Sequence, residues 1–143
     1  KVRLPGAGGA PEIASFCGRT LVLLRQNPRT FVKKLDFMTT VGMLDGDESR
    51  QKLCVPGQGP QAVITDLGIL EPDAVSRELV LTHLHPGVSA KVAIEATSWP
   101  LRAAEKLGST EAPSPRELAI LRALVPSEEC NVADLIPSTA DLE

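Results

Sequence analysis

The stretch that most constrains the fold is LPGAGGAPEIASFCGRTLVLL, residues 4–24. It places a glycine loop before a brief helix signal that begins at Pro11 and has Gly18 as its stop. The continuous apolar run at residues 20–24 follows, and such a run is typical of a strand covered on both faces. The stretch therefore predicts a loop, a short helix and a buried strand in close succession.

The glycine loop itself consists of Gly6, Ala7, Gly8 and Gly9. Glycine has no Cβ and adopts positive φ, so the backbone N–H groups of such a loop lie open to an anionic oxygen. The loop is not a Walker A motif, because no Gly-Lys-Ser/Thr follows, and not a dinucleotide fingerprint, because Pro11 replaces the third glycine. Two interpretations stay open: a tight strand-to-helix turn, or a loop whose amides bind the oxyanion of an acyl group.

Two further strand signals occupy residues 62–70 and 78–85, and Glu71-Pro72-Asp73 joins them. They predict an antiparallel hairpin with a rather long connection. The second signal alternates between the two faces of a strand. One face then carries Leu79, Leu81, His83 and His85, and the other carries Val80, Thr82 and Leu84.

The remaining segments are predicted from turn and capping residues. Residues 1–4 resemble the end of a strand, residues 31–38 fit either a helix or an extended segment, and residues 42–59 form a long surface loop. A helix is expected at residues 90–97, capped by Ser89, with Val92, Ala93 and Ala96 facing inward. Residues 108–113 are a connector, and Ser114-Pro115 begins a helix with a leucine stripe that runs up to Pro126.

Composition excludes several classes of protein. The chain has 143 residues, 43% apolar and 23% charged, as expected of one soluble globular domain. A net charge of −3 without a basic stripe argues against nucleic-acid binding. No apolar run has transmembrane length and no signal peptide is evident, so we expect no membrane partner and a cytoplasmic location. Cys17, Cys54 and Cys130 are odd in number and widely spaced, which indicates reduced thiols.

Few single residues point to chemistry. His83 and His85 form an H-x-H pair that could begin a metal site, but no third ligand stands at a suitable spacing. We therefore predict no metal and favour one packed and one turn-capping histidine. Cys17 is a candidate nucleophile that more simply fills the core. Ser15 lacks the G-x-S-x-G context of a nucleophile elbow.

Charged residues near the strand ends leave alternatives open. Arg25 and Arg29 follow an apolar strand, where they could meet the phosphates or a carboxylate of a ligand, although solvated ion pairs are favoured. Asp66 closes another strand signal. It could act as a general base or cap the following turn.

Four stretches of the chain form a recognisable set: residues 4–14 (LPGAGGAPEIA), 27–37 (NPRTFVKKLDF), 62–67 (AVITDL) and 85–88 (HPGV). In order and spacing they resemble the β subunit of family I CoA-transferases, over almost the whole chain. The glutaconate CoA-transferase branch is the more similar. Within it, the sequence resembles a bacterial group of CoA-transferase-like hydrolases that open a ring of steroid-derived CoA thioesters.

This resemblance implies an α/β fold with an open sheet of the CoA-transferase type. It implies an acyl-CoA substrate bound between this chain and an α-type subunit, in an α2β2 or similar assembly, without a further cofactor. The motif places Gly6, Ala7, Gly8 and Gly9 at the thioester, where their amides bind its oxygen. True transferases of the family also use a glutamate that attacks the thioester, in a Glu-Asn-Gly type motif well upstream of the glycine loop.

This chain has no residues at the position of that motif. The resemblance therefore predicts that residues 1–126 are the C-terminal portion of a β-subunit domain, whose N-terminal part is missing, and that residues 127–143 are a weakly structured tail. No residue of this chain is assigned a catalytic role, since the hydrolase-like group takes its catalytic carboxylate from the α subunit. We expect the polypeptide to be inactive alone.

Three functions follow, in order of preference. The first is a subunit of an enzyme that acts on acyl-CoA thioesters, by CoA transfer or by hydrolytic ring opening. The second is a non-catalytic structural partner that shapes the pocket of an α-type chain. The third is a sugar-phosphate isomerase-like activity, which ranks last because no Lys or Asp/Glu constellation supports it.

Overall fold

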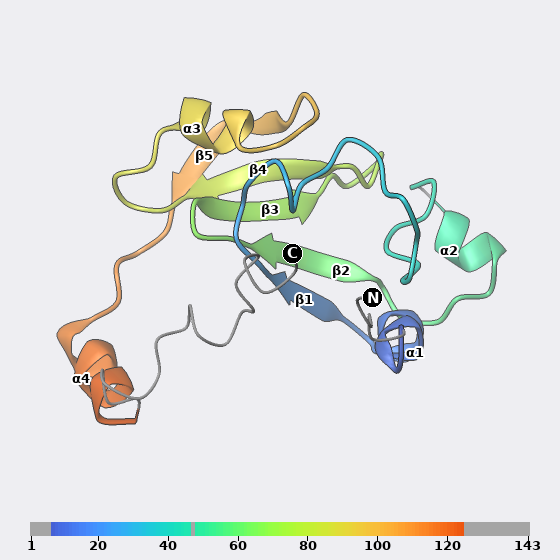
Figure 1. Ribbon diagram of the computed structural model, residues 1–143, viewed down its shortest axis with the longest axis horizontal. Coiled ribbons are helices and arrows are strands. Elements are labelled where there is room, and N and C mark those ends of the chain that lie inside the picture. The colour runs from blue at the N-terminus through green and yellow to red at the C-terminus, as the bar shows by residue number, and fades with distance from the viewer. Residues whose placement is uncertain (1–6, 47, 125–143) are drawn as a thin grey trace, which may run out of the picture. The chain divides into compact units, whose positions relative to one another are not determined.

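The computed structural model describes residues 7–46 and 48–124. Gly6–Glu111 form one compact unit built on a five-stranded sheet, and the last helix belongs to a second unit. The strands are β1 (Thr20–Leu23), β2 (Pro60–Ile64), β3 (Gly68–Pro72), β4 (Leu79–Leu84) and β5 (Arg102–Ser109), which neighbour one another in chain order (Figure 1). The sheet unit also contains α1 (Ala10–Phe16), α2 (Ser49–Lys52) and α3 (Ala90–Glu95), which confirms the expected α/β class with an open sheet.

The directions of the strands define two edges of the sheet. β1 pairs parallel with β2, and β4 pairs parallel with β5, while β3 runs antiparallel to both of its neighbours. β1, β2, β4 and β5 therefore point the same way. We call the edge where these four strands end the carboxyl edge, and the edge where they begin the amino edge.

The single strand predicted at residues 62–70 is wrong, because the chain turns in its middle. Thr65 makes this turn: its Oγ1 accepts hydrogen bonds from the N–H groups of Leu67 (3.1 Å) and Gly68 (3.0 Å). The sequence does not reveal this turn, because the residues on both sides of it are apolar. They are apolar because β2 and β3 both contribute to the core. The antiparallel pairing of residues 68–72 with residues 79–84 is confirmed.

Strand β5 was missed by the sequence analysis, which placed Gly108 in a connector. Its sequence, RAAEKLGS, lacks the β-branched and aromatic residues that signal a strand. The strand forms because β4 offers it a parallel partner. Gly108 lies within this strand, and glycine suits the position because a Cβ there would lie 2.4 Å from the ring of His83.

Strand β1 has the predicted position, but the prediction that both of its faces are covered is wrong for the described residues. Leu21 is 55% exposed and Leu23 is 73% exposed. The reason is topological: β1 is the outer strand of the sheet and pairs with β2 alone. Its apolar side chains therefore lack packing partners within the part of the chain that the structure describes.

The core is small and lies on the side of the sheet that α3 covers (Figure 1). Its buried apolar members are Phe31, Val63, Leu70, Leu81, Ala93 and Leu101. Phe31 stacks on Trp99 with ring centroids 5.7 Å apart. Residues 31–38, left open between helix and extended segment, form turns and bends instead.

The predicted helix at residues 90–97 is confirmed as α3, and its cap forms as expected: Val92 N–H donates to Ser89 Oγ at 3.4 Å. Ala93 faces inward and is fully buried, while Val92 is wrongly predicted as inward and is half exposed. No described helix is long and apolar enough to cross a bilayer.

Helix α4 (Pro115–Leu124) confirms the predicted start at Ser114. The Glu117 carboxylate accepts hydrogen bonds from the hydroxyl and the N–H of Ser114, and these bonds lower the pKa of Glu117. Leu121 and Leu124, part of the predicted stripe, are exposed within this unit. The predicted strand end at residues 1–4 and the predicted tail at residues 127–143 lie outside the described residues.

Candidate functional site

The glycine loop lies just before α1, with Ala7, Gly8 and Gly9 exposed; Gly6 lies outside the described residues. Gly8 has φ +54°, a conformation that glycine adopts without steric cost. The loop closes through a hydrogen bond from Ala10 N–H to the carbonyl of Ala7 (3.2 Å). No carbonyl of the described residues accepts a hydrogen bond from the N–H groups of Gly8 and Gly9.

A buried arginine holds the helix that follows this loop. Arg50 is only 6% exposed, and its guanidinium donates to five backbone carbonyls. Two of them, Ala14 (3.3 Å) and Ser15 (3.4 Å), belong to α1. The other three, Gly42, Pro56 (3.1 Å) and Gly57 (3.3 Å), belong to the 42–59 segment. Arg50 therefore fastens α1 to that segment.

The 42–59 segment was predicted as a surface loop, and the structure corrects this in part. It contains the single helical turn α2 and the buried Arg50. Close contacts seat it against α1 and β1, because a Cβ on Gly57 would lie 2.1 Å from the carbonyl oxygen of Cys17. Gln58 N–H also donates to the carbonyl of Gly18 at 3.1 Å. The segment is thus a fixed part of the amino edge.

A cavity of about 370 Å³ opens between the 42–59 segment and the turn that joins β3 to β4. The two segments meet at Gly46, where a Cβ would lie 2.3 Å from the carbonyl oxygen of Ser76. The polar side chains of the cavity are Arg50, Arg77, Gln51, Gln58 and Gln61. Among the described residues no carboxylate lines it, and its two charged side chains are both arginines.

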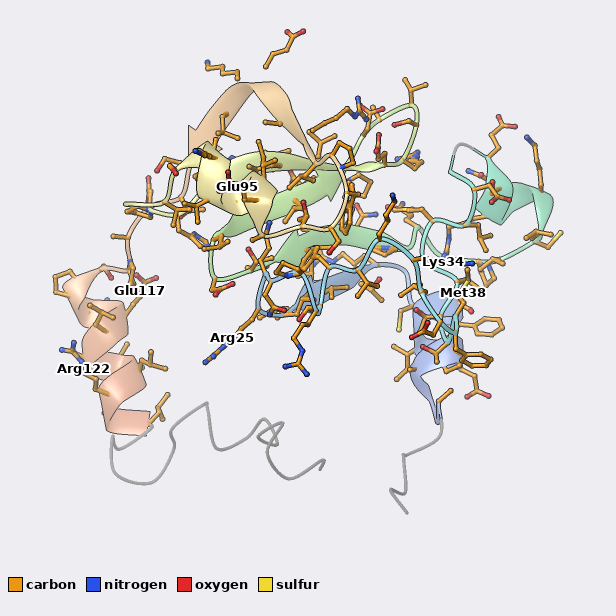
Figure 2. The ribbon with its side chains drawn as sticks, turned by 45° about the horizontal axis from the view of Figure 1, so that its top comes forward. Arg25, Lys34, Met38, Glu95, Glu117 and Arg122 are labelled. Carbon is orange, nitrogen blue, oxygen red and sulfur yellow. The ribbon has the colours of Figure 1, made fainter. Side chains whose placement is uncertain are left out.

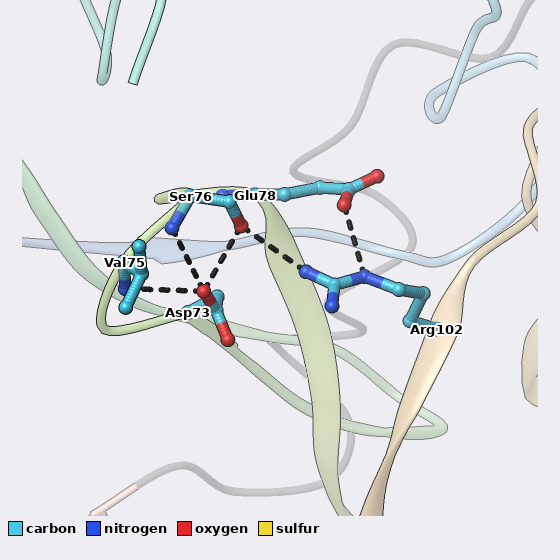
Figure 3. Close-up of polar contacts among 5 residues, drawn as sticks. All are labelled: Asp73, Val75, Ser76, Glu78 and Arg102. Atoms are coloured by element: carbon cyan, nitrogen blue, oxygen red, sulfur yellow. Dashed lines mark hydrogen bonds and ion pairs between the residues drawn. The ribbon is translucent and has the colours of Figure 1, made fainter. Parts of the chain in front are cut away.

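The β3–β4 turn is organised by Asp73 (Figure 3). Its Oδ1 accepts hydrogen bonds from the N–H of Ser76 (2.8 Å), the N–H of Val75 (3.1 Å) and the hydroxyl of Ser76 (3.0 Å). Nearby, Arg102 pairs with Glu78 at 2.9 Å and donates to Ser76 Oγ at 3.2 Å. Hydrogen bonding by the Ser76 N–H, then by the Val75 N–H, lowers the pKa of Asp73.

We expect the carboxyl of Asp73 to titrate below its ordinary value of 3.8 in the folded protein. Because the folded-state pKa is the lower one, the turn is fully stabilised above pH 3.8 and loses this contribution as the pH falls through the folded-state pKa. Carboxyl ¹³C NMR, recorded over a series of acidic pH values, measures the pKa of Asp73 in the folded protein. The Ser76→Ala variant removes the hydroxyl and keeps both N–H donors, so it should raise the pKa of Asp73 only part of the way toward 3.8, and Ser98→Ala should not change it. An identical Asp73 titration in both variants would contradict a contribution from the Ser76 hydroxyl.

The carboxyl edge carries a second polar cluster, centred on His85. Its Nε2 lies 2.8 Å from the carbonyl oxygen of Thr65, so that nitrogen must carry a hydrogen and donate it. Its Nδ1 lies 2.7 Å from Thr110 Oγ1, which completes the ring's hydrogen bonding. Gln26 joins the cluster by donating to the carbonyl of Ala93 (2.7 Å) and accepting from Thr65 Oγ1 (2.9 Å).

This cluster links strand ends, and its polar atoms bond to one another. Asp66 was considered above as a base or as a cap of the following turn. Its carboxylate instead accepts a hydrogen bond from the N–H of Gln26 at 2.8 Å, and the following turn is capped by Thr65. His83 contacts Thr82 Oγ1 through Nδ1 at 3.0 Å. Among the described residues no group of three His, Cys, Asp or Glu side chains is placed to hold a metal.

The side chains of the other candidates take no part in these two groups of polar contacts. Cys17 is exposed, so the prediction that it fills the core is wrong, because α1 buries none of its residues. Ser15 Oγ donates to the carbonyl of Pro11 at 2.6 Å, within its own helix. Arg25 (Figure 2) and Arg29 are exposed, and neither forms an ion pair within the described residues.

Arg50 is the functional candidate that sequence reasoning missed. Glycines on both sides of it, at 42, 46, 57 and 59, indicate a tightly folded segment, and all four have positive φ. No sequence pattern, however, marks an arginine that will be buried among backbone carbonyls. Its role depends on contacts with α1, which lies 35 residues earlier.

Comparison with known proteins identifies the family. The family model for coenzyme A transferase matches residues 1–96, more than half of the chain. This chain belongs to the coenzyme A transferase family. The expected resemblance is therefore confirmed at the level of the family.

Individual members of the coenzyme A transferase family agree. The chain is 54% identical to the B-type subunit of 3-oxoadipate CoA-transferase of Pseudomonas knackmussii, over 87% of this chain and 48% of that protein. The crystal structure of glutaconate CoA-transferase from Acidaminococcus fermentans matches with a TM-score of 0.76 at 35% identity, over 85% of this chain and 46% of that one. A structure of the decarboxylase AibA/AibB matches with a TM-score of 0.66 at 27% identity, over 90% of this chain and 47% of that one.

The chain spans about half the length of the relatives it matches. Its five-stranded open sheet has the fold of glutaconate CoA-transferase. The matched relatives are themselves named as subunits of CoA-transferases.

Proposed function

We propose that this chain is part of the B-type subunit of a CoA-transferase that moves coenzyme A between small carboxylic acids. The observation that carries the proposal is the 54% identity to the corresponding subunit of 3-oxoadipate CoA-transferase. A dicarboxylic or oxo-dicarboxylic acid is the favoured substrate class, because both B-type relatives are named for such acids. The protein works with an A-type subunit, in the cytoplasm, and needs no cofactor beyond the CoA thioester itself.

In this proposal the glycine loop binds the thioester oxygen. When a nucleophile attacks the thioester carbon, the carbonyl oxygen gains negative charge, and preorganised N–H donors stabilise it. Gly8 and Gly9 are exposed in a loop closed by the Ala7–Ala10 hydrogen bond, and no described carbonyl accepts from their N–H groups. Arg50 keeps α1 in place behind them, so that the donors do not need to reorganise during the reaction.

The nucleophile itself is proposed to come from outside this chain. A carboxylate adds to the thioester carbon, and the CoA thiolate leaves to give an acyl anhydride. The thiolate then attacks the anhydride and releases the free acid, with CoA now carried on the carboxylate. No residue of this chain is given a catalytic role, and we expect the chain alone to be inactive.

The test uses the full natural protein that carries this chain, co-expressed with its A-type subunit. With an acyl-CoA donor and 3-oxoadipate or glutaconate as acceptor, we expect CoA to appear on the acceptor. Borohydride or hydroxylamine should trap the carboxylate-bound intermediate. Release of free CoA from a ring-containing thioester with nothing trapped would favour hydrolytic ring opening instead. No turnover of any CoA thioester would leave only the role of a non-catalytic structural partner.

The loop can be probed without disturbing the fold through Gly9→Ala. Gly9 has φ −78°, which alanine tolerates, and a new Cβ would lie 3.7 Å from Ile13 Cδ1, an ordinary contact. The added methyl obstructs the approach of the thioester oxygen, so kcat should fall by roughly tenfold to a hundredfold with an unchanged Tm. Gly18→Ala, which adds a methyl in open space, is the control. Equal kcat values for Gly9→Ala and Gly18→Ala would contradict the proposal that the loop binds the thioester oxygen.

A further inference from the structure

The described lining of the cavity at the amino edge contains two arginines and no carboxylate. Arg50 donates only to neutral backbone carbonyls, and no carboxylate accompanies it within the described residues. A buried cation is normally paired with an anion, because its removal from water is costly. Among the described residues, the guanidinium of Arg50 is solvated by neutral carbonyl oxygens alone.

A second guanidinium faces the same cavity from the other side. Arg77 has φ +60° and is fixed by a hydrogen bond from its N–H to the carbonyl of Asp73 (3.1 Å). Its side chain is exposed and has no acceptor within the described residues. Within the β3–β4 turn itself, Asp73 is engaged by the turn and Glu78 by Arg102. Neither of them neutralises Arg77.

The remaining polar lining suits an oxygen-rich anion. Gln51, Gln58 and Gln61 offer amide N–H donors, and the cavity has a volume of about 370 Å³. Arginine binds phosphate through its planar fork of donors. We infer that this cavity binds a phosphate group, with Arg77 as the direct cationic contact and Arg50 as the fixed charge behind it. The inference that the cavity binds phosphate does not depend on the proposed function. The assignment of that phosphate to CoA does rest on the proposed function.

The experiment measures binding to the full natural protein, assembled with its A-type subunit, by isothermal titration calorimetry. The probes are inorganic phosphate, adenosine 3′,5′-bisphosphate, CoA and pantetheine, which lacks phosphate. Two variants change the cavity without touching the fold: Arg77→Gln removes the exposed charge, and Gln51→Glu places an isosteric carboxylate in the wall. Arg25→Gln and Asn27→Asp make the same chemical changes at the carboxyl edge.

We expect the phosphate-bearing probes to bind about tenfold more weakly to Arg77→Gln, since one charged hydrogen bond is lost, and binding to Gln51→Glu to be weaker still. The two control variants should match the unchanged protein. Equal affinity in all four variants, or no phosphate binding at all, would overturn the site. Binding of phosphate and the bisphosphate but not of CoA would keep the phosphate site and reject CoA as its source. If the enzyme transfers CoA but the cavity does not bind phosphate, the phosphate site is rejected and the proposed function is retained.

Discussion

Replacing Arg50 with methionine should destabilise the protein by on the order of 3 kcal/mol or more. Methionine has a similar length but no donors, so five backbone carbonyls lose the partner that the structure gives them. An unsatisfied buried carbonyl costs about 1–3 kcal/mol, and water will recover part of this at an amino edge that is only partly buried. Denaturant unfolding of the full natural protein measures the loss.

The effect of Arg50→Met should also be local. Amide hydrogen exchange should accelerate in α1 and in the 42–59 segment, which Arg50 joins, and much less in β3 and β4. Arg50→Lys should be intermediate, because an ammonium keeps the charge but cannot reproduce the fork that spans the carbonyls. Arg19→Met, at an exposed position, is the matched control. An Arg50→Met protein as stable as this control would show that the five hydrogen bonds contribute nothing.

Gly68→Ala should cost about 3 kcal/mol or more, although only one methyl group is added. A Cβ at this position would lie 2.2 Å from the carbonyl oxygen of His83 in the neighbouring strand. The obstacle is backbone within the β3–β4 ladder, so relief requires the two strands to move apart. Such a movement would also disturb the turn made by Thr65, whose Oγ1 accepts from Gly68 N–H. Thermal unfolding of the full natural protein measures the loss as a fall in Tm.

Two other glycines calibrate this prediction. Gly18→Ala adds its methyl where nothing lies within 4 Å, and its stability should change by no more than about 0.5 kcal/mol. Gly108→Ala should fall between the two, because its Cβ would meet the ring of His83, and a side chain can rotate where a backbone cannot. If Gly68→Ala unfolded at the same temperature as Gly18→Ala, the close approach of β3 and β4 would be refuted.

Several elements could be predicted from local sequence because their signals are local. The helix at Pro115 follows from Ser114 and Glu117, three residues apart, and the structure forms that cap. The cap of α3 by Ser89 is equally local. The glycine loop was also located by its sequence, since three glycines in four positions are visible without any tertiary context.

Other elements could not be predicted because their cause lies elsewhere in the chain. Strand β5 has a sequence without β propensity and forms only beside β4. The turn at Thr65 interrupts an apolar run, because both strands on either side of it pass through the same core. The exposure of β1 likewise depends on its outer place in the sheet and not on its residues.

By itself the sequence determined the family resemblance, the loop that presents amide donors and the types of most of its elements, because capping, glycine spacing and apolar periodicity act over a few residues. Only the tertiary structure decided the amino edge, where Arg50 gathers carbonyls from α1 and the 42–59 segment beside a cavity shared with Arg77. Those contacts join residues that are distant in the chain. A buried cation is stabilised by whichever acceptors the fold brings to it, and no local pattern specifies them.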